Sequence, residues 1–241
     1  QLQQRTEDLT LLGNVQLERW NQAPTRQQSS EADSVVRARQ TQWNLGSGSL
    51  EAQGPVLGQR RGPGHQTLQQ LHAKRLSGNT VKGFLDLIGP VKVLAPDRDG
   101  RLDATTTRWL FADDALLNDQ PFEASMKDSR LSGRGFRIAM GQTTVNVLSG
   151  CELKQPGDQL QASRCSWNWT TNQVEAQGNV RLQRKANQQI TRSDRLVGSV
   201  GRNGTVVFSS PGGSVQSELK INNSLKRPSM QEKDRSSPVS F

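Results

Sequence analysis

Few residues of this sequence could carry covalent chemistry or bind a metal. Its 241 residues include only two histidines, His65 and His72, and neither has a cysteine or carboxylate at the spacing of a metal site. Asp97 and Asp99 resemble the start of a calcium loop, but the later acidic ligands are missing, so we interpret this stretch as a hairpin turn. No phosphate-binding glycine loop, nucleophile elbow or catalytic carboxylate pair stands out. The sequence therefore predicts no enzyme, no metal site and no cofactor.

The two cysteines flank a turn signal. Cys151 and Cys165 lie on either side of residues 154–159, which contain Pro156 and Gly157. If the flanking segments form a hairpin centred on residue 158, the two side chains face each other with Cβ atoms about 4.5–5.5 Å apart. A disulfide needs about 3.5–4.5 Å, which is a small adjustment. A disulfide and two reduced thiols both stay open, and a disulfide would indicate a periplasmic or extracellular compartment.

The charge balance is basic, with 31 Lys and Arg against 22 Asp and Glu, a net charge of +9. Such a surface attracts anions, which include nucleic acids, lipid headgroups and acidic glycans. Aromatic residues make up 5% of the chain and tyrosine is absent, so few side chains could stack on bases. We therefore expect no nucleic-acid partner and keep a basic nucleic-acid-binding β protein as an alternative.

A tryptophan in a recurring frame organises the chain. Trp43, Trp109 and Trp167 each follow an aliphatic residue by seven positions and an alanine by five. The chain has only five tryptophans, so three in one frame indicate an internal repeat. Apolar residues also recur two, seven and thirteen positions after each tryptophan: Leu45, Leu50 and Val56; Phe111, Leu116 and Phe122; Trp169, Val174 and Val180.

Each frame is predicted to be a β-hairpin. Turn-compatible residues follow the tryptophans, at 46–48, 112–114 and 170–172. In the arm before the turn the apolar side changes, as between Ala162 and Cys165, and we interpret this change as a β-bulge in that arm. The arm after the turn alternates cleanly, which is typical of a half-buried strand, with one side formed by Leu50, Ala52, Gly54 and Val56.

A second motif, Arg-Leu-x-Gly, recurs between the frames at residues 75–78, 130–133 and 195–198. Its three copies are interpreted as equivalent, so that one cycle contains the two arms of the frame, the Arg-Leu-x-Gly strand and a return strand. Residues 1–222 are expected to form a single β-jellyroll domain of about three repeats, and residues 223–241 a disordered polar tail. No run of 18 apolar residues occurs, so no membrane span is predicted.

Short Gly-Asn-Val and Gly-Pro-Val motifs alternate with these elements, at residues 13–15, 54–56, 89–91 and 178–180. Together with the tryptophan frames and the Arg-Leu-x-Gly segments, over about residues 8–220, they resemble the OstA-like β-jellyroll family of lipopolysaccharide transport. The resemblance is closest to the LptC type and next to the LptA type. It lies in the order and repetition of the motifs, each of which is short.

The resemblance implies an all-β fold, an elongated V-shaped β-jellyroll of stacked antiparallel strands. It also implies a periplasmic lipopolysaccharide transport protein that holds acyl chains in the jellyroll groove. The lipid would come from an inner-membrane ABC transporter and pass along a bridge of jellyroll proteins joined through their edge strands. Since the chain opens on Gln1, we expect a membrane-tethering N-terminal segment upstream of it.

The lipid-binding groove would be lined by the apolar residues of the three frames: Trp43, Leu45, Leu50, Val56, Trp109, Phe111, Leu116, Phe122, Trp167, Trp169, Val174 and Val180. The alternative is that the tryptophans only fill a core, where each buries about 150–250 Å². The chain would then be a structural or adhesin-like β-repeat module without lipid.

Overall fold

The computed structural model describes residues 8–19, 34–62, 66–110, 112–139, 141–186, 188–201 and 204–219. The predicted tail at 223–241 lies outside these residues, as does His65. The strands are β1 Asp8–Arg19, β2 Ser34–Asn44, β3 Ser49–Arg61, β4 Thr67–Asn79, β5 Phe84–Ala95, β6 Gly100–Leu110, β7 Ala115–Met126 and β8 Ser129–Ala139. They continue with β9 Thr144–Gln155, β10 Asp158–Ala162, β11 Arg164–Asn168, β12 Gln173–Arg184, β13 Gln189–Ser199, β14 Val206–Ser209 and β15 Gln216–Glu218.

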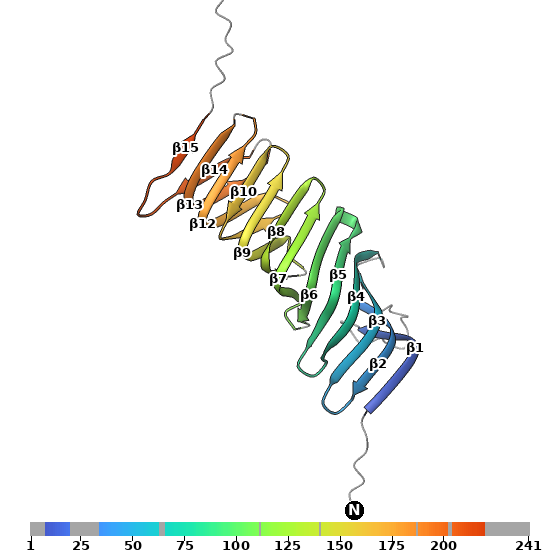
Figure 1. The fold of residues 1–241 in the computed structure, drawn as a ribbon. Coiled ribbons are helices and arrows are strands. Elements are labelled where there is room, and N and C mark those ends of the chain that lie inside the picture. Colours follow the sequence, from blue (N-terminus) through green and yellow to red (C-terminus); the bar gives the residue numbers. More distant parts are fainter. Residues whose placement is uncertain are drawn as a thin grey trace, which may run out of the picture.

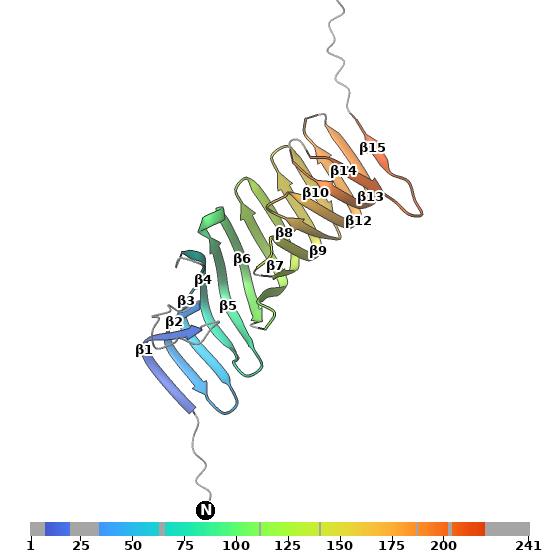
Figure 2. The ribbon, with the colours of Figure 1, turned by 180° about the vertical axis from the view of Figure 1, so that it is seen from behind.

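The strands form one antiparallel sheet in which neighbours in sequence are mostly neighbours in space. β1 lies at one end of the long axis and β15 at the other (Figures 1 and 2). This is the expected all-β, elongated and V-shaped jellyroll of stacked antiparallel strands. A short 3-10 turn, η2 Pro96–Arg98, joins β5 to β6, so residues 97–99 form the predicted hairpin turn. No helix among the described residues is long and apolar enough to cross a membrane.

Each long strand bends near its middle, and the bends stack into one line. On one side of the bend β2 pairs Gln40 with Gln53 of β3, and on the other side it pairs Arg37 with Leu57, so the register shifts by one residue. Such a shift is a β-bulge, which kinks and twists a strand. Because the shift recurs from strand to strand, the sheet folds over on itself along this line.

The two inward-facing residues that flank the bend are four positions apart in one strand and three positions apart in the next. β3 steps from Ala52 to Val56, whereas its neighbour β4 steps from Ala73 to Leu76. The same four-residue step occurs in β5, β7, β9 and β12, and the three-residue step in β2, β6, β8, β13 and across β10 and β11. With the four-residue step, the inward residues are all odd-numbered or all even-numbered along the whole strand. With the three-residue step, they change from even to odd numbers, or the reverse, at the bend.

In β1, β3, β5 and β12 the Gly-Asn and Gly-Pro motifs supply the extra residue of the four-residue step, whereas β7 and β9 make this step without such a motif. Gly13, Gly89 and Gly178 have φ values of +95°, +97° and +74°, which L side chains rarely adopt. Pro90 of β5 and Pro121 of β7, at the same level of the two strands, are exposed. The predicted irregularity is therefore confirmed, but its predicted position is wrong, because the extra residue belongs to the arm after the turn and not to the arm before it.

The folded sheet has two arms that pack face to face. We call the half that carries Trp43, Trp109 and Trp167 the Trp arm, and the other half the far arm. The core between them is one continuous cluster that runs from Ala38 of β2 to Leu196 of β13. The edge of the V opposite the bend is formed by the hairpin turns of both arms, and we call it the mouth.

The Arg-Leu-x-Gly motif is not a faithful repeat. Leu76 and Leu196 follow the bend and pair with Ala52 and Ala176 in the Trp arm. Leu131 precedes the bend and pairs with Ala124 in the far arm. The predicted equivalence of the three copies is thus wrong for the middle one, because a motif of only four positions does not define which half of a bent strand it occupies.

Candidate functional site

The three frame tryptophans occupy the same place in successive hairpins. Each pairs across its hairpin with the apolar residue seven positions later, so that Trp43 faces Leu50, Trp109 faces Leu116 and Trp167 faces Val174. Trp167 is 3% exposed, whereas Trp43 and Trp109 are half-buried. The frame is therefore a hairpin in all three copies, as predicted.

Most of the predicted lining residues face the interior between the arms. Half-buried tryptophans, including Trp169, pack against the core from the mouth side. Seven residues are fully buried: Leu50, Val56, Leu116, Phe122, Trp167, Val174 and Val180.

Leu45 does not line the interior. β2 ends at Asn44, so Leu45 is the first residue of the turn and its side chain is 56% exposed. The side chain of Asn44 accepts a hydrogen bond from the backbone N–H of Ser47, which fixes this turn. Phe111, the corresponding residue of the second frame, lies outside the described residues.

Two small apolar cavities lie in the middle of the interior. The first has a volume of about 50 Å³ and is lined by Trp109 and Leu87 of the Trp arm and Leu71 of the far arm. The second has a volume of about 100 Å³ and lies between Phe122 and Trp167. Because Gln69, Val93 and Leu116 line both, the two cavities adjoin. Sites for drug-sized ligands are typically about 300–1,000 Å³, so the interior as it stands is nearly filled by its own side chains.

A larger hollow of about 490 Å³ opens at the mouth. Its far-arm wall contains the turns at residues 97–98 and 126–129, and its Trp-arm wall contains residues 167–172. Arg98, Met126, Trp167 and Trp169 line both this hollow and the second cavity. The interior is therefore reached through the mouth hollow, between the turns of the two arms.

Polar contacts join the two arms on either side of the mouth hollow. Toward β1, Arg60 of the far arm pairs with Asp114 of the Trp arm, with 2.6 Å between Nη2 and Oδ2. Toward β15, the carboxylate of Asp158 accepts a hydrogen bond of 2.9 Å from the backbone N–H of Gly201. Separating the arms means breaking these contacts.

A disulfide joins the arms at the bend. Cys151 is the first inward residue of β9 in the far arm and Cys165 the first of β11 in the Trp arm, with 5.9 Å between their Cα atoms. The expected direct pairing is wrong, since Cys151 pairs with Ala162 and Cys165 with Val147. The hairpin turns at Pro156 and Gly157, and the interruption at Ser163 then turns Cys165 back toward Cys151.

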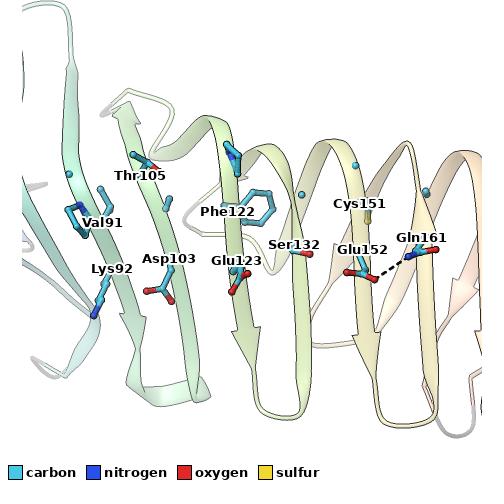
Figure 3. A pocket seen from close by; sticks show the side chains of 17 residues that line it. Val91, Lys92, Asp103, Thr105, Phe122, Glu123, Ser132, Cys151, Glu152 and Gln161 are labelled. Carbon is cyan, nitrogen blue, oxygen red and sulfur yellow. Dashed lines mark hydrogen bonds between the residues drawn. The ribbon is translucent and has the colours of Figure 1, made fainter.

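A shallow groove of about 900 Å³ follows the outer side of the bend. Figure 3 shows Lys92, Asp103, Glu123 and Glu152 in one row across successive strands. Gln161 donates a 3.2 Å hydrogen bond to Glu152. The row contains one cation and three carboxylates, so the groove does not favour an anionic ligand.

Metal-binding geometry is not found in the described part of the chain, where no three His, Cys, Asp or Glu side chains gather at a suitable site. His72 is an exposed residue of β4.

Several residues of the site outside the three frames were not predicted from the sequence, and they lie in both arms and in the turns. Met126, Leu131 and Val145 line the second cavity, and Arg98 and Gln155 line the mouth hollow. The alternation of Val145 and Val147 in β9 was a usable signal. The turn residues gave no such signal in the sequence, because their proximity in space depends on how far the sheet folds over.

No protein-family model matches this sequence, and no curated protein matches it at significant similarity. The class of protein is therefore defined by the fold alone, as an elongated β-jellyroll with an apolar interior and an open mouth.

Proposed function

We propose that this protein is a non-enzymatic carrier that holds lipid acyl chains between its two arms and passes them along a bridge of jellyroll proteins. The observation that supports the proposal best is the continuous apolar core from β2 to β13, which is accessible through the mouth hollow. Each buried CH₂ contributes about 0.8 kcal/mol, so acyl chains can bind without any polar site. The net charge of +9 favours anionic lipids such as lipopolysaccharide.

Binding requires that the arms move apart. The two cavities of about 50 and 100 Å³ are too small for several acyl chains. Apolar packing between the arms is non-directional, and an acyl chain can replace one apolar contact with another. The polar contacts across the mouth and the disulfide at the bend limit where this opening occurs, since the bend stays joined while the mouth separates.

Both ends of the sheet are suited to pairing with other jellyrolls. Among the described strands, β1 has β2 as its only neighbour, while β14 and β15 each pair only with β13. Apolar side chains are exposed here, with Leu12 of β1 at 75% and Val207 of β14 at 70%. Unpaired edges accept an added strand from a partner, which is how a bridge would form.

The disulfide supports an oxidising compartment such as the periplasm. The lipopolysaccharide cargo, the inner-membrane ABC transporter as donor and the upstream membrane tether come from the resemblance described above. They belong to the same proposal.

The direct test is mass spectrometry of organic extracts of the purified protein, combined with photocrosslinking. A photoreactive residue at Leu116 or Val180, both buried between the arms, is expected to crosslink to lipid. The same residue at Thr105, which is exposed at the bend, serves as control. A preparation that is consistently lipid-free and gives no crosslink from either buried position contradicts the proposal.

A second candidate function is a structural β-repeat module without lipid. It is favoured by the nearly filled interior, where Leu50, Val56 and Val180 are at most 2% exposed. The two candidates differ in the same experiment, because a structural module gives neither extracted lipid nor interior crosslinks.

A further inference from the structure

Three buried polar atoms without a partner surround the mouth hollow. In the described part of the chain, the indole nitrogens of Trp167 and Trp169 and the amide oxygen of Gln155 have no hydrogen-bond partner. All three residues line the hollow, and Trp167 and Gln155 are 3% and 9% exposed. Native proteins pair nearly all buried polar groups, because an unpaired one is destabilising. Three such atoms around one hollow indicate a site built for a polar ligand.

The rest of Gln155 is held firmly in place. Its amide nitrogen donates hydrogen bonds of 3.1 Å to the hydroxyl of Ser129 and 3.1 Å to the side-chain oxygen of Asn172. These bonds connect the far arm to the Trp arm and aim the amide oxygen at a fixed position. The acceptor is therefore preorganised, which reduces the entropy lost when a ligand binds.

The donors and acceptor define the chemistry of the ligand. Two indole N–H groups require acceptor oxygens, and the amide oxygen of Gln155 requires a donor. A hydroxyl group provides both functions. The charged side chains at the hollow are balanced, with Arg98 and Lys127 against Asp97 and Asp128, so the hollow does not require a charged head.

An apolar cavity adjoins the hollow and could hold the tail of a ligand whose polar head binds there. The second cavity adjoins the hollow at Met126, Trp167 and Trp169, and its wall is mainly apolar, with Phe122 and Ile138 among its residues. We propose that the mouth hollow binds the hydroxylated head, a sugar or glycerol group, of an amphiphile whose acyl chain enters the adjoining cavity. The inference rests on the proposed function and deepens it, because it places the lipid head at the mouth and lets the chain enter sideways.

The test uses n-octyl-β-glucoside below its micelle concentration, with the indole N–H signals of the ¹⁵N-labelled protein as the readout. The signals of Trp167 and Trp169 are expected to shift on titration. Trp169→Phe removes one donor and keeps an aromatic ring at this position, and is expected to weaken binding about threefold to tenfold. Thr41→Val is the matched control, since the Thr41 hydroxyl is also buried without a partner among the described residues, and Thr41 lines neither the hollow nor the adjoining cavity. It is expected to bind as tightly as the unmodified protein.

A second pair of variants tests the acceptor. Gln155→Glu keeps an acceptor oxygen and is expected to retain binding, whereas Gln155→Met is expected to weaken it about threefold to tenfold. Octyltrimethylammonium, which has the same tail and no hydroxyl, is expected to bind more weakly than the glucoside. Circular dichroism confirms that each variant is folded.

The proposal is overturned if the glucoside does not bind, if it binds without shifting the two indole signals, or if both detergents bind equally. These outcomes leave the interior lipid crosslinks intact, so failure of the head site is distinguishable from failure of the carrier function. Trp169→Phe and Gln155→Met variants that bind the glucoside as tightly as the unmodified protein also contradict it.

Discussion

Trp43, Trp109 and Trp167 share one sequence frame but differ in their surroundings. Their hairpin partners and the residues thirteen positions on, such as Val180, are buried as expected. Of the three tryptophans, only Trp109 and Trp167 line one of the two interior cavities, and only Trp167 lines the mouth hollow. The sequence predicts the hairpin from local spacing, whereas the cavities depend on how distant turns meet.

Gly89 is required by the bend, and Gly89→Ala is expected to destabilise the protein. Its φ is +97°, and an added Cβ would lie 2.5 Å from the Cβ of Lys74 on the neighbouring strand. Such backbone strain costs about 1–3 kcal/mol, and the steric clash adds to it. Gly83→Ala is the control, since Gly83 has a φ of +75° in open space and suffers only the strain. Equal losses of unfolding free energy in urea would contradict the close approach.

Glu152 is predicted to contribute to stability in a pH-dependent way. The hydrogen bond from Lys154, supported by Gln159 and Gln161, lowers the pKa of the Glu152 carboxyl, against a smaller effect of burial. A carboxyl whose folded pKa is lowered stabilises the protein above its ordinary pKa, and this contribution disappears as the pH falls through the folded pKa. Glu152→Gln is therefore expected to reduce the acid-induced loss of stability in urea titrations. Glu123→Gln, at the same level of β7, is the control, and an equal effect of both would contradict the role of Lys154.

At the scale of elements, the disulfide links the two arms at a place where no single strand crosses the bend. Most strands run through the bend without a break, but here the chain forms two short strands, β10 and β11, and Cys151–Cys165 joins the arms between them. A crosslink that closes a loop of about 15 residues stabilises a protein by about 3 kcal/mol. The Cys151→Ser/Cys165→Ser variant is expected to lose roughly this much unfolding free energy. Adding reductant to the variant should change nothing further, and an unchanged midpoint in the variant itself would disprove the stabilising role.

The ion pair between Arg60 and Asp114 is expected to limit opening of the mouth. Asp114→Asn removes a contact between the arms and is expected to accelerate uptake of a fluorescent acyl chain. Its effect on stability should be at most about 1 kcal/mol, because the pair is partly exposed. Asp113→Asn is the control, since Asp113 pairs with Arg137 within the Trp arm at 3.0 Å. Stopped-flow rates that change equally in both variants would contradict the assignment.

Strand existence was predictable and strand register was not. Alternation within each arm after the turn predicted a strand there. The bulges lie in β1, β3, β5 and β12, which carry Gly-Asn or Gly-Pro motifs, and in β7 and β9, which do not, although the parity change appears in the neighbouring strands. A bulge is a property of two paired strands, so one strand read alone shows that a shift exists but not where the extra residue lies.

At the scale of the whole molecule, the exposed apolar residues at the two ends predict end-to-end association. Leu12→Lys at β1 or Val207→Lys at β14 is expected to weaken concentration-dependent assembly measured by sedimentation velocity, because a charge at an edge opposes strand pairing. Leu148→Lys is the control, since Leu148 is 57% exposed on β9, away from both ends. Assembly that is unaffected by either end variant would mean that the edges do not pair.

The alternation of three- and four-residue steps also restricts how such a chain can change in length. A strand with the longer step needs a neighbour with the shorter one, as Ala52 and Val56 of β3 face Leu76 and Ala73 of β4. Duplication or loss of a single strand would place two strands with the same step side by side. Half of one strand would then point its apolar side chains outward instead of into the interior. A hairpin gained or lost as a pair leaves every remaining pairing intact. The jellyroll can therefore become longer or shorter only in even numbers of strands, and its length changes in units of one hairpin.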